Sequence, residues 1–346
     1  MAVKEKKSGG YDKFLKDLKA GTLENLYIFY GEEAYLREHY LNELRTQLVP
    51  EGFEEFNYHR LQGKGLAMQE LAEAVEAMPM MAERTLVTVT DLDMFKLDES
   101  SRNALMEILS DVPEYCVVVF VYDIVGYKRD GKMKKLCAVL DKFAQEVEFC
   151  EQERAALVKW VRRRFAAAGH DIDSAATDHL LFTCGTLMTD LVPEIAKIAS
   201  YAKGQSITVA DINAVADPIL DAQVFDMTRR ITEGNYDGAA KILGDLLRMQ
   251  EEPIMILAAV GKELRKLYTA RLALDSGKDK NWLKQVWGIK DYPADLLLKA
   301  ARKVDHAWCS RAVQQCQVLD RRLKSETGMD KEAGLKLFLM ELAGTK

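Results

Sequence analysis

Over the first 150 residues, short apolar runs of strand length lie between stretches with helical spacing. The predicted strands are LYIFY (26–30), FNYHRL (56–61), TLVTVT (85–90), YCVVVFVY (115–122) and EVEF (146–149). The predicted helices cover 35–48, 68–78, 105–109 and 134–143. Alternating strands and helices predict βαβ crossovers and therefore a parallel sheet. YCVVVFVY is apolar almost throughout, which is typical of a central strand buried on both faces.

Beyond residue 150 the strand signal ends, and only helical spacing continues. Apolar positions from 157 to 165 predict one helix, and others are expected near 173–183 and 187–203. Thr208 with Asp211 three residues later resembles a capping box at the start of a further helix. The region from 151 to 215 is therefore predicted to be a small helical domain.

The segment VADPIL (215–220) is expected to be a hinge into a third, all-helical region covering 216–346. Apolar residues at 239, 242, 243, 246 and 247 lie on one face of a helix, and Pro253 is suited to open the next. GIKDYP (288–293) is predicted to be a loop, with two further helices closing the chain. The whole chain then divides into a disordered tail (1–10), an α/β domain (11–150) and these two helical domains.

Composition describes a globular protein: 346 residues, 48% of them apolar and 29% charged. No apolar run approaches the roughly 18 residues of a membrane helix, and MAVKEKKSGG lacks the apolar middle of a signal peptide. We therefore expect a cytoplasmic protein with no membrane partner. The net charge of −6 disfavours nucleic-acid binding by the whole surface. The basic segments WVRRRF (160–165) and LDRRLK (319–324) are interpreted as solvated helix faces, with phosphate contact as the alternative.

Familiar catalytic and metal signatures are missing from the sequence. None of the six cysteines forms a C-x-x-C pair, and the five histidines do not complete a zinc site. G-x-S-x-G, H-E-x-x-H and G-x-G-x-x-G do not occur. No catalytic residue, metal site or cofactor is predicted.

GEEAYLRE (31–38) follows the first strand, where a phosphate-binding loop of the form G-x-x-x-x-G-K-[ST] would begin. Aligned from Gly31, that pattern has Leu36 at its second glycine, Arg37 at its lysine and Glu38 at its hydroxyl residue. Leu36 obstructs the approach of phosphate to the backbone, and Glu38 adds negative charge. We expect Leu36 to pack inward and Glu38 to be a first-turn acid of the following helix.

The third strand ends in Asp91-Leu92-Asp93. A nucleotide hydrolase places an acidic pair here to hold magnesium and activate water. Leu92 interrupts that pair, so Asp91 and Asp93 are interpreted as a polar strand end and turn. The first domain thus has the order of a nucleotide-binding fold without its chemistry, and we expect it to act through a surface.

AMPMMAERTLVTV (77–89) places two adjacent methionines, Met80 and Met81, between a helix and a strand. Pro79 ends the helix because it lacks a backbone donor. One interpretation is that the methionines cap the core beneath the loop. The other is a flexible apolar tip, with Met78 and Pro79 beside the pair, that enters a pocket on a partner.

Four stretches in register resemble the delta subunit family of bacterial DNA polymerase III: LYIFYGEEAYLRE, AMPMMAERTLVTV, GTLMTDLVPEIAKIASYA (185–202) and VFDMTRRITEGNYDGAAKILGDLL (224–247). The resemblance spans nearly the whole chain. It implies an AAA+-like parallel-sheet domain without ATPase activity, then a small helical lid and a helical collar.

The resemblance also implies partners and a site. The family's clamp-contacting pair falls on Met80 and Met81, where relatives more often have an aromatic residue or leucine. The implied partners are the sliding clamp (beta), the ATP-hydrolysing gamma/tau subunits and delta-prime through the collar, and primed DNA within the assembled complex. LKSETG (323–328) is similar to a collar loop that can face the primer–template end, and it has Thr327 where an aromatic residue can occur.

The resemblance leads us to expect a non-catalytic clamp-loader subunit that opens or holds open the clamp ring during DNA replication. Two alternatives remain at this point. One is an active ATPase with an unusual phosphate loop, and the other is a helical scaffold unrelated to replication.

Overall fold

Five parallel strands form the sheet of the first half of the chain in the computed structural model, which describes residues 9–326 and 328–344. The strands are β1 (Leu26–Tyr30), β2 (Tyr58–Gln62), β3 (Thr85–Thr90), β4 (Cys116–Val121) and β5 (Gln145–Glu148). Their order across the sheet is β2-β3-β4-β1-β5, and every neighbouring pair is parallel. The predicted parallel sheet is therefore confirmed, with each strand within two residues of its expected start.

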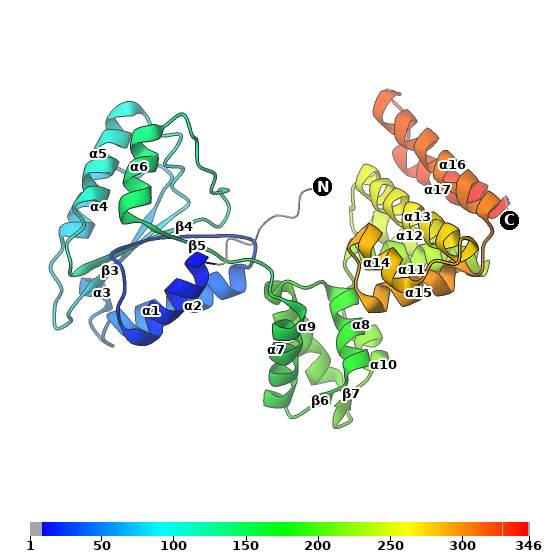
Figure 1. Cartoon of the computed structure of the whole chain (residues 1–346), viewed down its shortest axis with the longest axis horizontal. Coiled ribbons are helices and arrows are strands. Elements are labelled where there is room, and N and C mark those ends of the chain that lie inside the picture. Colours follow the sequence, from blue (N-terminus) through cyan, green and yellow to red (C-terminus); the bar gives the residue numbers. More distant parts are fainter. Residues whose placement is uncertain (1–8, 327, 345–346) are drawn as a thin grey trace. The chain divides into compact units, whose positions relative to one another are not determined.

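Helices cover both faces of this sheet (Figure 1). Helices α4 (Met68–Glu76), α5 (Glu99–Ser110) and α6 (Lys134–Phe143) pack buried leucines against one face. Helices α1 (Gly9–Ala20) and α2 (Ala34–Leu48) cover the other, and α3 (Glu54–Asn57) is a single turn before β2. Helix α1 has no counterpart in the sequence prediction, and Gly9 and Gly10, assigned there to the tail, begin it. Its Phe14 packs edge-to-face on Tyr27 and Phe29 of β1.

Strand β4 is buried at all six positions, as its continuous apolar run predicts. It lies between β3 and β1, so its side chains contribute to the core on both faces. Full burial of a valine or phenylalanine side chain contributes about 1.5–3 kcal/mol, which makes this strand a main source of stability.

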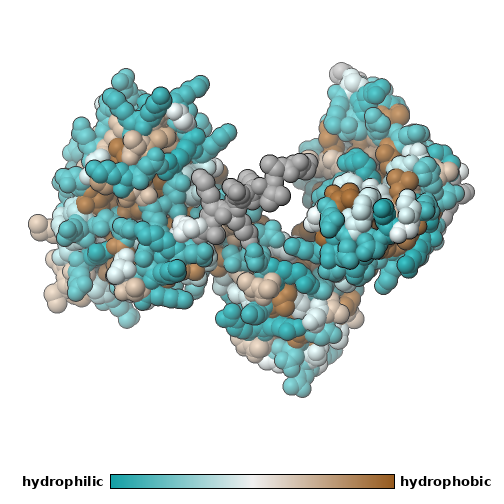
Figure 2. Space-filling model, in the orientation of Figure 1, coloured by the Kyte–Doolittle hydropathy of each residue, from teal (hydrophilic) through white to brown (hydrophobic). Residues whose placement is uncertain are grey.

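Two compact units make up the chain. One extends to Glu153 and includes Leu187–Thr189, and the other comprises Arg154–Thr186 and the chain from Asp190 onward. Hydrophilic side chains cover most of the visible surface of each unit, and apolar side chains are scattered among the hydrophilic ones (Figure 2). Among the described residues, no helix is long and apolar enough to cross a membrane.

The second unit is almost wholly helical. Its helices are α7 (Arg154–Ala167), α8 (Ser174–Cys184), α9 (Met188–Tyr201, whose first two residues belong to the first unit), α10 (Val209–Val215), α11 (Leu220–Glu233), α12 (Tyr236–Arg248), α13 (Pro253–Asp275), α14 (Lys280–Trp287), α15 (Asp291–Ala301), α16 (His306–Ser325) and α17 (Lys331–Gly344). One hydrophobic core joins α11 to α17, with α13 contributing a long buried face. Pro253 opens α13, and Thr208 and Asp211 form a capping box at α10, as predicted.

Three expectations for this half of the chain were wrong. A short parallel pair, β6 (Asp171–Ile172) with β7 (Ser206–Ile207), lies in the region expected to be purely helical. The predicted loop at 288–293 is shorter, because Asp291 already begins α15. Three helices rather than two then close the chain.

Candidate functional site

The segment from Ala77 to Arg84 connects α4 to β3 at the edge of the sheet where the strands begin. We call residues Met78–Met81 the methionine tip. Helix α4 ends at Glu76, two residues earlier than expected, and Pro79 follows within the tip. The side chains of Met78, Met80 and Met81 are 80%, 45% and 78% exposed. The thioethers are therefore accessible to a partner, and none of them belongs to the core cluster of this unit.

The backbone of the methionine tip is held in place by Asn57, a fully buried residue at the end of α3. Asn57 Nδ2 donates to the carbonyl oxygen of Met80 at 2.8 Å, and the N–H of Met80 donates to Asn57 Oδ1 at 2.8 Å. Met81 has a φ of 55°, an uncommon left-handed conformation for a residue with a side chain. Local conformations of this kind persist where the surroundings enforce them.

Apolar exposure in the first unit concentrates at this edge. Among its described residues, the large hydrophobic residues with exposed side chains are Phe56, Met78, Met80, Met81 and Ile124. Four of the five belong to the methionine tip or to α3, which contacts the tip through Asn57. Adjacent exposed apolar side chains mark interaction sites more strongly than scattered ones.

The opposite edge of the sheet contains the degenerate phosphate loop. Strand β1 lies next to β4 in the sheet, but the chain passes from β1 to β2, which lies two strands beyond β4. The carboxyl ends of β1 and β4 therefore form a topological switch point, the place where open parallel sheets bind ligands. Gly31 makes the turn after β1 with a φ of 119°, and a Cβ there would lie 2.3 Å from the carbonyl oxygen of Phe149. Only glycine fits this close approach.

Side chains of the protein itself occupy this loop. Leu36 is buried, as expected. Arg37 is 4% exposed and donates to the carbonyl oxygen of Gly31 at 2.7 Å and to the carboxylate of Asp123. Its positive charge is therefore paired internally. Glu38 is exposed on the second turn of α2, so the expectation that it is a first-turn acid was wrong: the helix begins at Ala34.

Glu33, at the N-cap position of α2, is fully buried. Its carboxylate accepts hydrogen bonds from the N–H of Met188 at 3.0 Å and from Thr189 Oγ1 at 3.4 Å. A buried carboxylate at the start of this helix repels the anions that a helix start otherwise attracts.

Asp91 has a structural role at the end of β3. Its Oδ1 accepts hydrogen bonds from the N–H groups of Asp123, Ile124 and Val125 at 2.8, 3.0 and 3.0 Å. Leu92 is buried, and Asp93 pairs with Lys96 at 2.8 Å. Asp91 and Asp93 thus order the strand end and the turns beside it, in agreement with the interpretation from sequence.

Both basic segments lie on helices with local partners. In α7, Arg164 lies 5.0 Å from the ring centre of Trp160, and Arg162 donates to Ser174 Oγ at 2.8 Å. In α16, Arg322 pairs with Glu326 and Lys324 with Asp320. Thr327, the residue of the predicted primer–template loop, lies outside the described residues.

Within the described part of the chain, no group of three or more histidine, cysteine or acidic residues could hold a metal ion.

Three residues of these two edges were not found from sequence: Asn57, Glu33 and Asp123. Asn57 bonds to a residue 23 positions away and Asp123 to one 86 positions away, so no local pattern reveals either contact. Glu33 carried a weak signal, since an acid at a helix start is common and only its burial is unusual.

Two family models match this chain. One, described as "DNA polymerase III, delta subunit", matches residues 27–150, and the other, "DNA polymerase III delta subunit, C-terminal domain", matches residues 221–342. Together they cover more than two thirds of the sequence.

Curated relatives agree with this match. DNA polymerase III subunit delta of Bacillus subtilis is 24% identical over 334 residues, covering 94% of this chain and 95% of the relative. The probable DNA polymerase III subunit delta of Aquifex aeolicus is 24% identical over 276 residues, covering 78% of this chain and 77% of the relative.

Among solved structures, the Bacillus subtilis DNA clamp loader delta protein has 22% identity and a TM-score of 0.49 over 96% of this chain and 99% of that one. The Thermotoga maritima RuvB Holliday junction branch migration motor has 13% identity and a TM-score of 0.40 over 64% and 71%.

The fold defines a protein with a five-stranded parallel-sheet domain followed by helical regions, as expected. Its phosphate-loop position is occupied by its own side chains. The chain belongs to the DNA polymerase III delta subunit family.

Proposed function

We propose that this chain binds the sliding clamp (beta) through the methionine tip, with Met80 and Met81 as its centre and Met78 and Pro79 beside them. The observation that carries the proposal is the exposed methionine pair on a backbone that Asn57 holds by two hydrogen bonds. Methionine side chains suit such a contact because they are apolar and adapt to irregular pockets. A preorganised backbone lowers the entropy lost when the tip binds.

The tip opens the clamp, or holds it open, by binding the open ring more tightly than the closed one. A ligand shifts an equilibrium only by the difference in its affinity for the two states. Binding energy from the tip therefore stabilises an open clamp interface while the complex loads it onto primed DNA.

This chain does not hydrolyse ATP in the proposed mechanism. Arg37 is tied to Gly31 and Asp123, and Glu33 adds a buried carboxylate at the helix start. A bound triphosphate would have to displace the Arg37 side chain and approach the Glu33 carboxylate. ATP-hydrolysing gamma/tau subunits supply the energy in this account.

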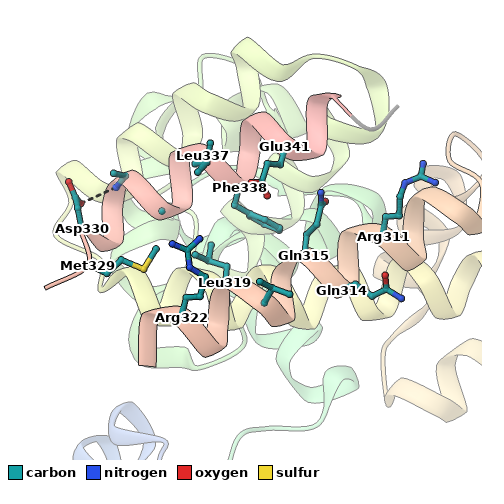
Figure 3. Close-up of a pocket in the computed structure, with 13 residues that line it drawn as sticks. Arg311, Gln314, Gln315, Leu319, Arg322, Met329, Asp330, Leu337, Phe338 and Glu341 are labelled. Atoms are coloured by element: carbon teal, nitrogen blue, oxygen red, sulfur yellow. Dashed lines mark hydrogen bonds between the residues drawn. The ribbon is translucent and has the colours of Figure 1, made fainter. Parts of the chain in front are cut away.

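The helical collar, proposed to cover residues 216–346, joins this chain to gamma/tau and delta-prime subunits. Because α11 to α17 share one hydrophobic core, we expect the collar to be rigid. Its outer surface has a 580 Å³ groove between α16 and α17, in which Gln315 and Phe338 lie between the two helices (Figure 3). Exposed Val318, Leu337 and Met340 lie on these two helices. The α/β domain (11–150) and the lid (151–215) complete the proposed layout of this cytoplasmic, nucleoid-associated subunit.

Binding of the purified whole chain to its cognate sliding clamp tests the proposal, measured by titration calorimetry without nucleotide. Saturable one-to-one binding supports it. A chain that is folded by circular dichroism but shows no clamp binding at micromolar concentration contradicts it. Labelled ATP in place of the clamp tests the alternative, since magnesium-dependent binding would restore the active-ATPase interpretation.

A further inference from the structure

Exposed acidic residues lie on the elements next to the methionine tip. The acidic rim consists of Glu54, Glu55, Glu76 and Glu83, all with exposed side chains. Within the described residues, none of the four forms a salt bridge. Arg84 is the only cationic residue between Lys64 and Lys96 in the sequence, and its guanidinium donates to the carbonyl oxygen of Leu23 at 3.1 Å. The guanidinium groups of Arg45 and Arg60 lie 5.9 and 5.6 Å from the ring centre of Tyr58, which follows α3, but neither forms a salt bridge with the rim within the described residues.

Hydrogen bonds define where this rim lies. The two Asn57–Met80 bonds attach α3, which carries Glu54 and Glu55, directly to the methionine tip. Tyr115 Oη donates to the carbonyl oxygen of Glu76 at 3.2 Å, so the end of α4 lies beside the start of β4. Glu83 belongs to the same connection as the tip.

Two further features extend the same surface. Phe56 is 48% exposed and precedes Asn57, which adds an aromatic side chain to the apolar centre. A groove of 390 Å³ lies between α4 and α5, with Val75 and Ile108 among its apolar walls. Glu76, Glu107 and Asp111 also line it. Because Glu76 belongs to both, the acidic character continues from the rim into the groove.

We propose that the clamp surface receiving the tip is an apolar pocket bordered by lysine or arginine side chains. This inference rests on the proposed function, because it describes the partner of the same site. An apolar centre with unpaired charge around it is how specific interfaces are arranged, with the rim controlling encounter and register. A neutral or acidic border on the partner would leave these carboxylates unpaired or repelled at short range.

Salt and charge affect the two parts of such an interface differently. Charges at the rim raise the association rate by long-range attraction, and salt screens that attraction beyond about 10 Å at 0.1 M. The apolar centre governs mainly the dissociation rate, which salt affects little. Association kinetics therefore report on the rim separately from the methionines.

The experiment measures association and dissociation rates of the whole chain with its cognate sliding clamp at low and high salt. The test variants are Glu54→Lys with Glu55→Lys and the isosteric Glu54→Gln with Glu55→Gln. The matched control is Glu43→Lys with Glu151→Lys, two exposed acidic residues of the same unit that lie outside the rim.

The proposal predicts that charge reversal slows association at least about fivefold at low salt and that the glutamine pair slows it less. Both differences shrink at high salt, and the control stays near the wild type. Rates equal to the control, or faster association, would overturn the cationic border. If Met80→Ala with Met81→Ala abolishes binding while the acidic variants match the control, the proposed function stands and this inference fails. If neither set of variants changes binding, both are rejected.

Discussion

One buried amide satisfies both backbone groups of Met80: Asn57 donates to its carbonyl oxygen and accepts from its N–H, each at 2.8 Å. The Asn57 side chain thereby makes the two backbone hydrogen bonds that a neighbouring strand makes to a residue in a β-sheet. The consequence is that an exposed thioether lies on an ordered backbone. We therefore expect stability and the proposed clamp binding to be linked at this position.

Asn57→Ala should lower the free energy of unfolding by about 1–3 kcal/mol, because it removes both bonds and leaves two Met80 backbone groups without them. The folded variant should also bind the clamp more weakly, since the tip becomes less ordered. Urea unfolding and calorimetry measure the two effects. The control is Gln152→Ala, whose amide donates to the carbonyl oxygen of Cys150 at 3.0 Å in the same unit. Unchanged clamp affinity in Asn57→Ala would show that order at Met80 does not matter for binding.

Asp91→Ala should destabilise the first unit by about 2 kcal/mol or more, because one carboxylate oxygen accepts three backbone N–H bonds. Asp91→Asn keeps an oxygen at that position and tolerates the φ of 57°, so it should cost less. Chemical denaturation of both variants gives the comparison. Equal losses for the two substitutions would refute the capping role.

Labelled ATP should show no magnesium-dependent binding to this chain at concentrations up to about 1 mM, the weak end of specific affinity. Arg37→Lys should not create binding, because it restores the lysine of the pattern while Glu33 remains buried beside it. Arg37→Lys should instead destabilise the fold, since one ammonium cannot reproduce the guanidinium contacts to Gly31 and Asp123. Nucleotide binding by the wild-type chain would contradict the account of this loop.

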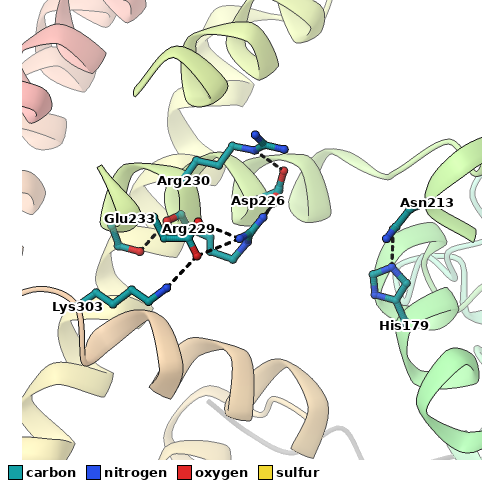
Figure 4. A network of polar contacts seen from close by, with 8 residues as sticks. His179, Asn213, Asp226, Arg229, Arg230, Glu233 and Lys303 are labelled. Atoms are coloured by element: carbon teal, nitrogen blue, oxygen red, sulfur yellow. Dashed lines mark hydrogen bonds and ion pairs between the residues drawn. The ribbon is translucent and has the colours of Figure 1, made fainter. Parts of the chain in front are cut away.

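Acid should weaken an ion-pair network in the second unit. In this network Asp226 accepts from Arg229 and Arg230, and Glu233 accepts from Arg229 and Lys303 (Figure 4). Burial pushes the pKa of Asp226 upward, but hydrogen bonds from Arg230 and Arg229 outweigh it, so its pKa lies below the usual value. Because the unfolded chain then binds the proton more readily, this stabilisation is present above about pH 4 and is lost as pH falls through the folded pKa.

Asp226→Asn should therefore reduce stability at pH 7 and flatten the loss of stability below about pH 4. Thermal unfolding between pH 7 and pH 3 measures both. If stability falls as steeply at low pH in Asp226→Asn as in the wild type, other carboxylates cause the pH dependence.

The sequence was most informative where packing follows periodicity. TLVTVT and YCVVVFVY became β3 and β4, because runs of apolar and β-branched residues fit strands of a parallel sheet that is covered on both faces. Pro253 and the Thr208–Asp211 pair marked helix starts because capping chemistry is local. Helix α1 was missed, since GGYDKFLKDLKA begins with two glycines and has one fully buried residue, Phe14.

The residues of the candidate site also divide into those that a local sequence pattern reveals and those that it does not. The methionine pair and the failed phosphate loop are visible because each is a contiguous segment. Asn57, Asp123 and the salt-bridge-free acidic rim are not, because topology brings them together from separate elements. The position of Asn57 beside Met80 depends on β2 and β3 being neighbours in the sheet, which no short-range pattern specifies.

The most direct test of the central claim compares the clamp affinity of the wild-type chain with that of Met80→Ala with Met81→Ala. Because both side chains are exposed, the double variant should keep the wild-type unfolding midpoint. Its clamp binding should weaken by about 2 kcal/mol or more, the scale of interface hot spots. Met249→Ala with Met255→Ala, two exposed methionines of the second unit, is the matched control and should bind normally. Wild-type clamp affinity in a folded Met80→Ala, Met81→Ala variant would contradict the account.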